Sequence, residues 1–98
     1  PREDEHIRAV YHLYVVRTPH RDRLRAFLKE KGIETGIHYP IPLHLQPAFQ
    51  YLGYKKGDFP HTERCSEEIL SLPMYPELTR AQIETIVDVI KEFEERFL

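Results

Sequence analysis

The strongest constraint on the fold is an apolar repeat near the end of this 98-residue chain. Its members recur at the spacing of one helix face and are Ile83, Ile86, Val87, Ile90, Phe93 and Phe97. Thr79 and Gln82 stand at the two positions of a capping box in front of the repeat. Leu78 and Ile83 suit the hydrophobic staple that accompanies such a box. The pattern predicts a helix over Arg80–Arg96.

Three earlier segments have the character of β-strands. Val10–Val16 is β-branched or aromatic and apolar on both faces, so we expect a strand that is central or covered on both sides. Ile33–Tyr39 alternates in the same manner and ends at Pro40, because proline cannot donate to a ladder. Leu70–Leu72 is a short strand candidate that Pro73 stops.

Helices are predicted between these segments. Thr18 can cap a helix and Pro19 suits its first position. The apolar stripe that follows consists of Leu24, Phe27 and Leu28. Gly32 is expected to end this helix. A short helix is predicted over Gln46–Leu52, and a further helix is predicted to start near Pro60.

The resulting order, β-α-β-α-α-β-α, indicates a small α/β (α+β) domain in two layers. The first two strands flank one helix and should run parallel through a right-handed crossover. The third strand is expected to pair antiparallel between them, which gives a three-stranded mixed sheet with helices mainly on one face. We assign residues 1–9 to a polar tail or interdomain linker and residues 10–98 to the domain.

Composition excludes several classes of function. The chain has 14 Lys and Arg against 16 Asp and Glu, and the net charge of −2 excludes a global basic field for nucleic acid. No apolar run approaches the ~20 residues that a membrane-spanning helix needs. The single cysteine, Cys65, excludes a disulfide framework and a cysteine zinc site. A lone thiol fits a reducing compartment, so we expect a cytoplasmic protein.

Three features could carry chemistry but have simpler explanations. The six histidines do not form an HExxH motif or pair with cysteines, so surface or hydrogen-bonded histidines are favoured over a metal site. Arg21, Arg25 and Lys29 share one face of the first predicted helix, which a solvated surface explains better than a phosphate site. Cys65 lies on an expected core stripe and is interpreted as a small buried hydrophobe, not a nucleophile.

The segment Gly36–Pro47 is the strongest candidate for a binding site. Its three prolines stiffen a stretch that also carries His38, Tyr39, His44 and Gln46. Rigid loops that display polar donors commonly form binding sites. Composition leaves open the alternative of a stiff connector with incidental polar residues.

Longer stretches of sequence carry a family resemblance. The chain resembles the C-terminal segment of the DegT/StrS family in the runs YHLYVVRTPHRDRLRAFLKEKGIETGIHYP, GIHYPIPLHLQPAFQYLGY, GDFP and EEILSLPMYPELTRAQI. Members of this family are aminotransferases that depend on pyridoxal phosphate (PLP) and act on nucleotide-linked keto sugars in polysaccharide or amino-sugar biosynthesis. The resemblance extends from about Tyr11 to Ile90. It implies the type I aminotransferase fold, of which this chain matches the small C-terminal domain.

The resemblance also implies that the catalytic machinery lies elsewhere. In the family, the lysine that forms the internal aldimine with PLP belongs to a large domain that this chain lacks. The lysines of this chain stand in no matching motif and are Lys29, Lys31, Lys55, Lys56 and Lys91. We therefore expect no catalytic, cofactor-binding or metal-binding residue in this chain, and we expect the chain alone to be inert.

The same resemblance places four residues on the substrate side. His38 is expected near the substrate sugar or its diphosphate, Tyr39 is expected to shape the mouth of the site, and His44 and Gln46 are further candidates. The full-length enzyme is expected to be a homodimer with glutamate as amino donor. The isolated chain is expected to self-associate through apolar surface left bare. The alternative is a free-standing α/β interaction or regulatory module without catalysis.

Overall fold

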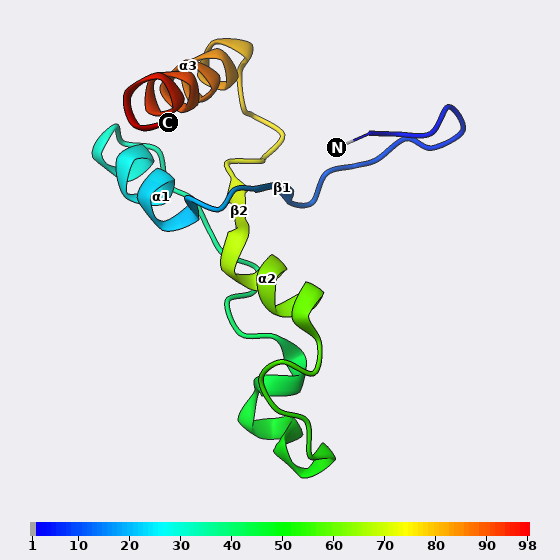
Figure 1. Cartoon of the computed structure of the whole chain (residues 1–98). Coiled ribbons are helices and arrows are strands. Elements are labelled where there is room, and N and C mark those ends of the chain that lie inside the picture. Colours follow the sequence, from blue (N-terminus) through cyan, green and yellow to red (C-terminus); the bar gives the residue numbers. More distant parts are fainter. Residues whose placement is uncertain (1) are drawn as a thin grey trace.

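The computed structural model describes residues 2–98. It shows three parts: a lobe built around a sheet and two segments that extend away from it in different directions (Figure 1). The elements are the strands β1 (Tyr14–Arg17) and β2 (Ile69–Leu72), the α-helices α1 (Arg21–Glu30), α2 (Pro60–Glu68) and α3 (Arg80–Phe97), and the 3₁₀ helices η1 (Leu43–Leu45) and η2 (Pro47–Leu52). We call β1, β2, α1 and α3 the lobe, and residues 40–59, which hang away from it beyond α2, the arm. Residues 2–13 extend in a third direction.

The chain is more extended than a compact domain of its size. Its radius of gyration is 16.0 Å, whereas a compact domain of this length has about 13 Å. Its accessible surface is 7909 Å², against about 5,900 Å² expected for a compact monomer of this mass. The arm and the N-terminal segment therefore leave surface that nothing else in residues 2–98 covers.

The two strands of the lobe form an antiparallel sheet in which Val16 lies opposite Leu70. The side chains of Val16, Leu70 and Leu72 belong to the core beneath α1 and α3. Side chains alternate along a strand, so Ser71 points to the opposite face of the sheet. On the other edge of β2, Ser71 also forms an isolated antiparallel bridge with Gly36. The segment around Gly36 is thereby attached to the lobe at one point.

The domain mixes helices and strands as predicted, but the expected third strand is absent from residues 2–98. Ile33–Tyr39 contributes only the Gly36 bridge. Its first residue, Ile33, is used to close the end of α1, and Pro40 behind it cannot extend a ladder. The segment is therefore too short to pair as a strand.

The first strand also differs from its prediction. Val10–Val16 was expected as the strand, whereas β1 begins at Tyr14 because β2 offers only four pairing positions. Cover on both faces is wrong as well, since Val15 is exposed and burial alternates along β1. The face of the sheet that carries Val15 is therefore exposed at that residue.

Helix α1 begins later than predicted. His20 is the N-cap, and the expected cap residue Thr18 forms the turn before it. The Thr18 hydroxyl accepts from the N–H of His20 at 3.2 Å, and the Thr18 carbonyl accepts from the N–H of Arg21 at 3.2 Å. These two hydrogen bonds form a turn before the helix, and the first helical residue is therefore Arg21.

Helix α1 ends where the glycine predicts. Gly32 adopts φ +78°, a conformation that glycine reaches without strain. Its N–H donates to the Lys29 carbonyl at 3.0 Å, and the N–H of Ile33 donates to the Leu28 carbonyl at 2.9 Å. This pair of bonds is a Schellman motif, and it turns Ile33 into the core beside the fully buried Leu28.

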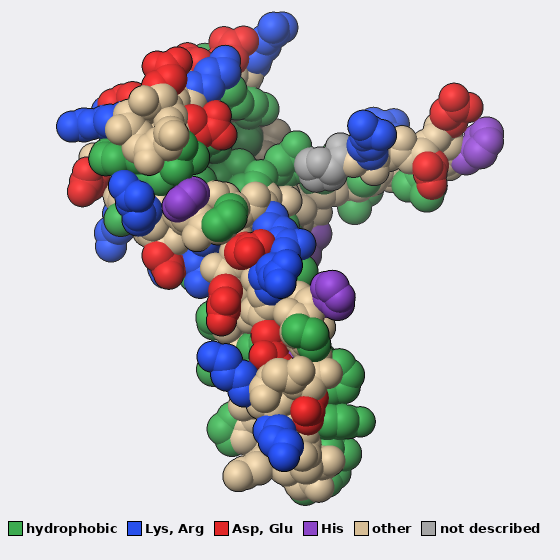
Figure 2. Space-filling view, viewed as in Figure 1, with side chains coloured by type: hydrophobic (Ala, Val, Ile, Leu, Met, Phe, Trp, Pro, Cys, Tyr) green, Lys and Arg blue, Asp and Glu red, His purple; other side chains and the backbone are tan. Residues whose placement is uncertain are grey.

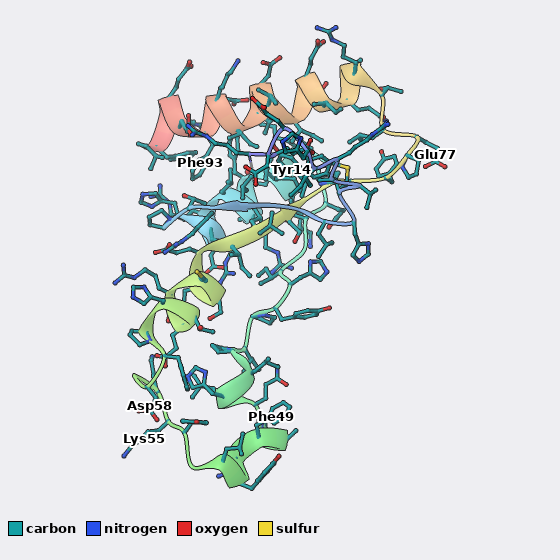
Figure 3. All side chains as sticks on the ribbon, turned by 90° about the vertical axis from the view of Figure 1, so that its right-hand side faces the viewer. Tyr14, Phe49, Lys55, Asp58, Glu77 and Phe93 are labelled. Atoms are coloured by element: carbon teal, nitrogen blue, oxygen red, sulfur yellow. The ribbon has the colours of Figure 1, made fainter. Side chains whose placement is uncertain are left out.

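Helix α3 confirms its capping box and runs one residue past the predicted end. The Thr79 hydroxyl accepts from the N–H of Gln82 at 3.3 Å, and the Gln82 side chain accepts from the N–H of Thr79 at 2.9 Å. Phe93 points from α3 into the lobe (Figure 3), where its ring lies 5.7 Å from that of Phe27. The buried apolar core consists of Leu24, Phe27, Leu28, Ile33, Leu70, Ile86 and Phe93. Within residues 2–98, no helix has both the length and the apolar character to cross a membrane.

The arm contains two 3₁₀ helices in place of the single helix predicted over Gln46–Leu52. Gln46 itself is extended, with φ −74° and ψ 139°, and separates η1 from η2. Gly53, left-handed at φ 77°, ends η2 as expected. Neither 3₁₀ helix has a buried residue. The later predictions are confirmed, since α2 starts at Pro60 and β2 contains Leu70–Leu72.

Candidate substrate-side site

His38 lies on the sheet face that is turned away from the helices. Its Nδ1 is 2.9 Å from the hydroxyl oxygen of Ser71, whose side chain points to that face. The residue is exposed, and within residues 2–98 its Nε2 has no hydrogen-bond partner. One ring nitrogen is therefore anchored on the lobe, and the other is free for a group outside this chain.

Tyr39 and Gln46 line one small apolar cavity between the arm and α2. Its volume is about 210 Å³, and Ile41 and Cys65 also line it. The Gln46 amide donates to the carbonyl of Ile41 at 3.3 Å, so this side chain folds back onto the arm. Cys65, predicted to be a buried hydrophobe, is half-buried with a free thiol. The structure thus brings Tyr39 and Gln46, two of the four predicted residues, together in one cavity, and Tyr39 directly follows His38 in the chain.

His44 is enclosed by the arm. Its Nε2 is 2.9 Å from Oε1 of Glu63, and the two side chains are only 7% and 12% exposed. The ring of Phe59 packs edge-on against the His44 ring at 4.9 Å. The imidazole of His44 is thus enclosed within the chain, whereas that of His38 is anchored through Nδ1 only and stays exposed.

Glu63, in the first turn of α2, organises the arm and was not predicted from the sequence. Its carboxylate accepts from the N–H of Gly57 at 2.8 and 3.0 Å and from the N–H of Phe59 at 3.4 Å. The hydrogen bond from His44 lowers the pKa of Glu63 below its ordinary value, and the amides of Gly57 and Phe59 lower it further against the opposing effect of burial. The available signal was an acidic residue in the first turn after Pro60.

The basic face of α1 divides into two parts. Arg25 and Lys29 are exposed, as a solvated face predicts. The prediction is wrong for Arg21, which is 9% exposed. Its guanidinium donates to the carbonyls of Ser66 and Ile69 at 3.2 Å, at the carboxyl end of α2. Arg21 therefore ties the lobe to the helix that carries the arm, because a cation there satisfies carbonyls that a helix end leaves free.

The residues present do not by themselves fit PLP or a metal ion. Among residues 2–98, no three His, Cys, Asp or Glu side chains gather closely enough to hold a metal. PLP enzymes of this type need a lysine amine inside the cofactor pocket. All five lysines of this chain are exposed, and Nζ of Lys31 is bonded to both carboxylate oxygens of Glu92 at 2.9 Å. Residues 2–98 therefore contain no enclosed lysine amine of the kind that PLP needs.

The fold matches a portion of solved aminotransferases. The crystal structure of Streptomyces venezuelae DesV in complex with a ketimine intermediate superposes with a TM-score of 0.85 at 42% identity, over 91% of this chain and 24% of that chain. A model of the DegT/DnrJ/EryC1/StrS aminotransferase family matches residues 1–91. The chain belongs to this family.

Two curated relatives show how much of such a protein the chain represents. It is 50% identical over 97 residues to a pleiotropic regulatory protein of Geobacillus stearothermophilus, which covers 99% of this chain and 26% of that protein. It is 42% identical over 87 residues to a dTDP-3-amino-3,4,6-trideoxy-alpha-D-glucose transaminase of Streptomyces venezuelae, over 89% of this chain and 23% of that protein. The chain therefore spans about a quarter of the length of these relatives.

Proposed function

We propose that this chain is the substrate-side C-terminal domain of a PLP-dependent aminotransferase that transfers an amino group to a nucleotide-linked keto sugar. Family membership, the transaminase named among its relatives and the quarter-length match support this assignment. PLP and its lysine would belong to the other three quarters, because the lysines of this chain are exposed. We further propose a cytoplasmic homodimer with glutamate as amino donor, and no catalysis by the chain alone.

The observation that carries the site assignment is the way His38 is held. One ring nitrogen is anchored to Ser71 and the other is free on an exposed residue. A ring fixed in this manner can hydrogen-bond a sugar hydroxyl or a phosphate oxygen. Tyr39 and Gln46 would contribute through the cavity that they line. His44 would act by bracing the arm, since its ring is enclosed against Glu63.

Replacement of His38 in the full-length enzyme tests this assignment. His38→Ala should slow the half-reaction with the nucleotide-linked sugar and spare the half-reaction with the amino donor. A lost hydrogen bond to a charged phosphate costs about 1.5–3 kcal/mol, or roughly ten- to a hundredfold in kcat/KM. Single-turnover rates of both half-reactions, measured beside the melting temperature, give the answer.

His44→Ala is the matched control for that experiment. It removes an imidazole that is committed to Glu63, so it should lower the melting temperature and affect both half-reactions together. If His38→Ala behaves in the same way as His44→Ala, His38 is a bracing residue and the site assignment is wrong.

A free-standing interaction or regulatory module, the alternative function, makes a different demand on the surface of the chain. A self-sufficient module should cover its own apolar surface, whereas this chain exposes far more surface than a compact monomer of its mass. The regulatory name of the Geobacillus relative belongs to a protein about four times as long as the match. We therefore favour the enzyme domain.

A further inference from the structure

We propose that Ser71 and Gly36 are positioning residues that fix the orientation and the tautomer of His38, so that its free Nε2 carries the hydrogen. The consequence for substrate binding rests on the proposed function of His38. The positioning itself depends only on contacts within this chain and can be tested separately.

Ser71 is a rigid anchor. It is 4% exposed and lies in the centre of β2. Its N–H donates to the Gly36 carbonyl at 2.8 Å, and its carbonyl accepts from the N–H of Gly36 at 3.0 Å. Its other neighbour is Val15 of β1. With its backbone held from both sides, its hydroxyl has a fixed starting point from which to reach His38.

The Ser71 hydroxyl determines which nitrogen of His38 bears the hydrogen. Within residues 2–98 the partner of this hydroxyl is Nδ1 of His38, at 2.9 Å. If Nδ1 carried the hydrogen and donated, the hydroxyl hydrogen of a buried serine would have no acceptor, which is unfavourable. The satisfied arrangement has the hydroxyl donating to Nδ1. A neutral imidazole then carries its hydrogen on Nε2 and presents a donor outward.

Gly36 provides the space that the ring needs. Residues opposite each other in an antiparallel pair place their side chains on the same face, so a side chain at Gly36 would stand beside that of Ser71. A Cβ at Gly36 would lie 2.7 Å from Cε1 of His38. The ring of His38, two residues further on, occupies the place of this missing side chain. An alanine should push the ring off Ser71 and leave the backbone intact, because the clash is with a movable side chain.

The tautomer can be read directly from the ¹⁵N shifts of histidine-labelled full-length enzyme above the pH at which its imidazoles are protonated. The His38→Ala spectrum identifies the His38 signals. We expect the Nε2–H tautomer in the parent protein and a mixture of tautomers in Ser71→Ala and Gly36→Ala. Ser71→Thr, which keeps a hydroxyl, should restore the parent pattern. Ser66→Ala is the control, since it deletes another buried serine hydroxyl whose bond goes to the carbonyl of Glu63.

The same variants allow a kinetic test of the proposal. Ser71→Ala should lower kcat/KM for the nucleotide-linked sugar by about two- to tenfold, the size of one neutral hydrogen bond, with the amino-donor half-reaction unchanged and recovery in Ser71→Thr. An Nδ1–H tautomer in the parent, or a His38 spectrum that Ser71→Ala and Gly36→Ala leave unchanged, overturns the proposal. If the tautomer responds and His38→Ala has no effect on the sugar half-reaction, the positioning stands and the proposed function fails.

Discussion

The lobe and the arm of this molecule are stabilised by different forces. Of the seven buried apolar residues in residues 2–98, six belong to the lobe, including Leu28 and Leu70 with no exposed surface, and the seventh, Ile33, packs with them just behind α1. The arm has no buried residue in η1 or η2 and is held by the carboxylate of Glu63 and by edge-on aromatic contacts, such as Tyr54 with Phe59 at 5.0 Å. Hydrophobic side chains gather along one edge of the arm (Figure 2).

This difference indicates that the lobe is the folding unit and that the arm is suited to contact another surface. Burial supplies most of the stability of a domain, so the lobe is the unit that folds. A segment held by a few polar bonds, with apolar side chains exposed, is suited to meet another surface. The exposed apolar residues of the arm are Ile41, Leu43, Tyr51, Leu52, Tyr54 and Phe59. The candidate site starts at the junction of the two parts, beside Ser71.

Truncating one leucine in each part gives the largest expected contrast. Leu70 is fully buried in the lobe, whereas Leu43 in the arm is 67% exposed. Leu70→Ala should lower the free energy of unfolding by about 2–5 kcal/mol, a large part of the total stability of a small domain. Leu43→Ala should change it by no more than about 0.5 kcal/mol. Urea unfolding followed by circular dichroism measures both, and similar losses would erase the distinction between lobe and arm.

Removing the charge of Glu63 should loosen the arm and spare the lobe. Glu63→Gln keeps the size of the side chain but weakens its bonds to Gly57, Phe59 and His44. We expect several-fold faster hydrogen exchange at the amides of Gly57 and Phe59, with exchange in β2 unchanged. Glu67→Gln on the same helix is the control, since within residues 2–98 the exposed Glu67 side chain makes no hydrogen bond to the arm. Equal acceleration in β2 would show that arm and lobe unfold together.

Acid should have the same local effect as that substitution. The hydrogen bond from His44, followed by the amides of Gly57 and Phe59, lowers the pKa of Glu63 below the ordinary 4.5. A carboxyl whose pKa is depressed by folding stabilises fully above its unfolded pKa and loses that contribution as the pH falls through the folded pKa. The amide resonances of Gly57 and Phe59 should therefore shift below pH 4.5. A Glu63→Gln protein that shows the same shift would assign it to another group.

The smallest expected effect concerns association of the isolated chain. Exposed aromatic residues on the arm should make it self-associate weakly at high concentration. Tyr51→Ser should reduce this association, whereas Val10→Ser, at an even more exposed apolar residue outside the arm, should not. Sedimentation velocity across a concentration series distinguishes the two. A strictly monomeric parent chain, or an equal response to both changes, would contradict the role given to the arm.

Local patterns in the sequence were sufficient where the interactions themselves are local. The capping box of α3 joins Thr79 to Gln82, and the end of α1 depends on Gly32 and its immediate neighbours. In both places the residues that decide the structure are adjacent in the chain. The mixed helix–sheet class followed from the same local patterns.

The remaining features depend on partners that lie far apart in the sequence. Arg21 bonds to Ser66, 45 residues away, and His44 bonds to Glu63, 19 residues away, so neither contact leaves a periodic signal. Strand pairing has the same property, since the length of β1 is set by β2. For the site, the sequence identified the segment Gly36–Pro47 but not the unequal environments of its two histidines.

Hydrogen exchange of the full-length enzyme, with and without a nucleotide-linked keto sugar, tests the central claim that this domain meets the substrate through Gly36–Pro47. We expect peptides covering Gly36–Pro47 to exchange more slowly when the sugar nucleotide is bound, while peptides from α3 on the opposite side of the sheet stay unchanged. Unchanged exchange in Gly36–Pro47 under saturating sugar nucleotide, with protection only in other parts of the enzyme, would contradict the account.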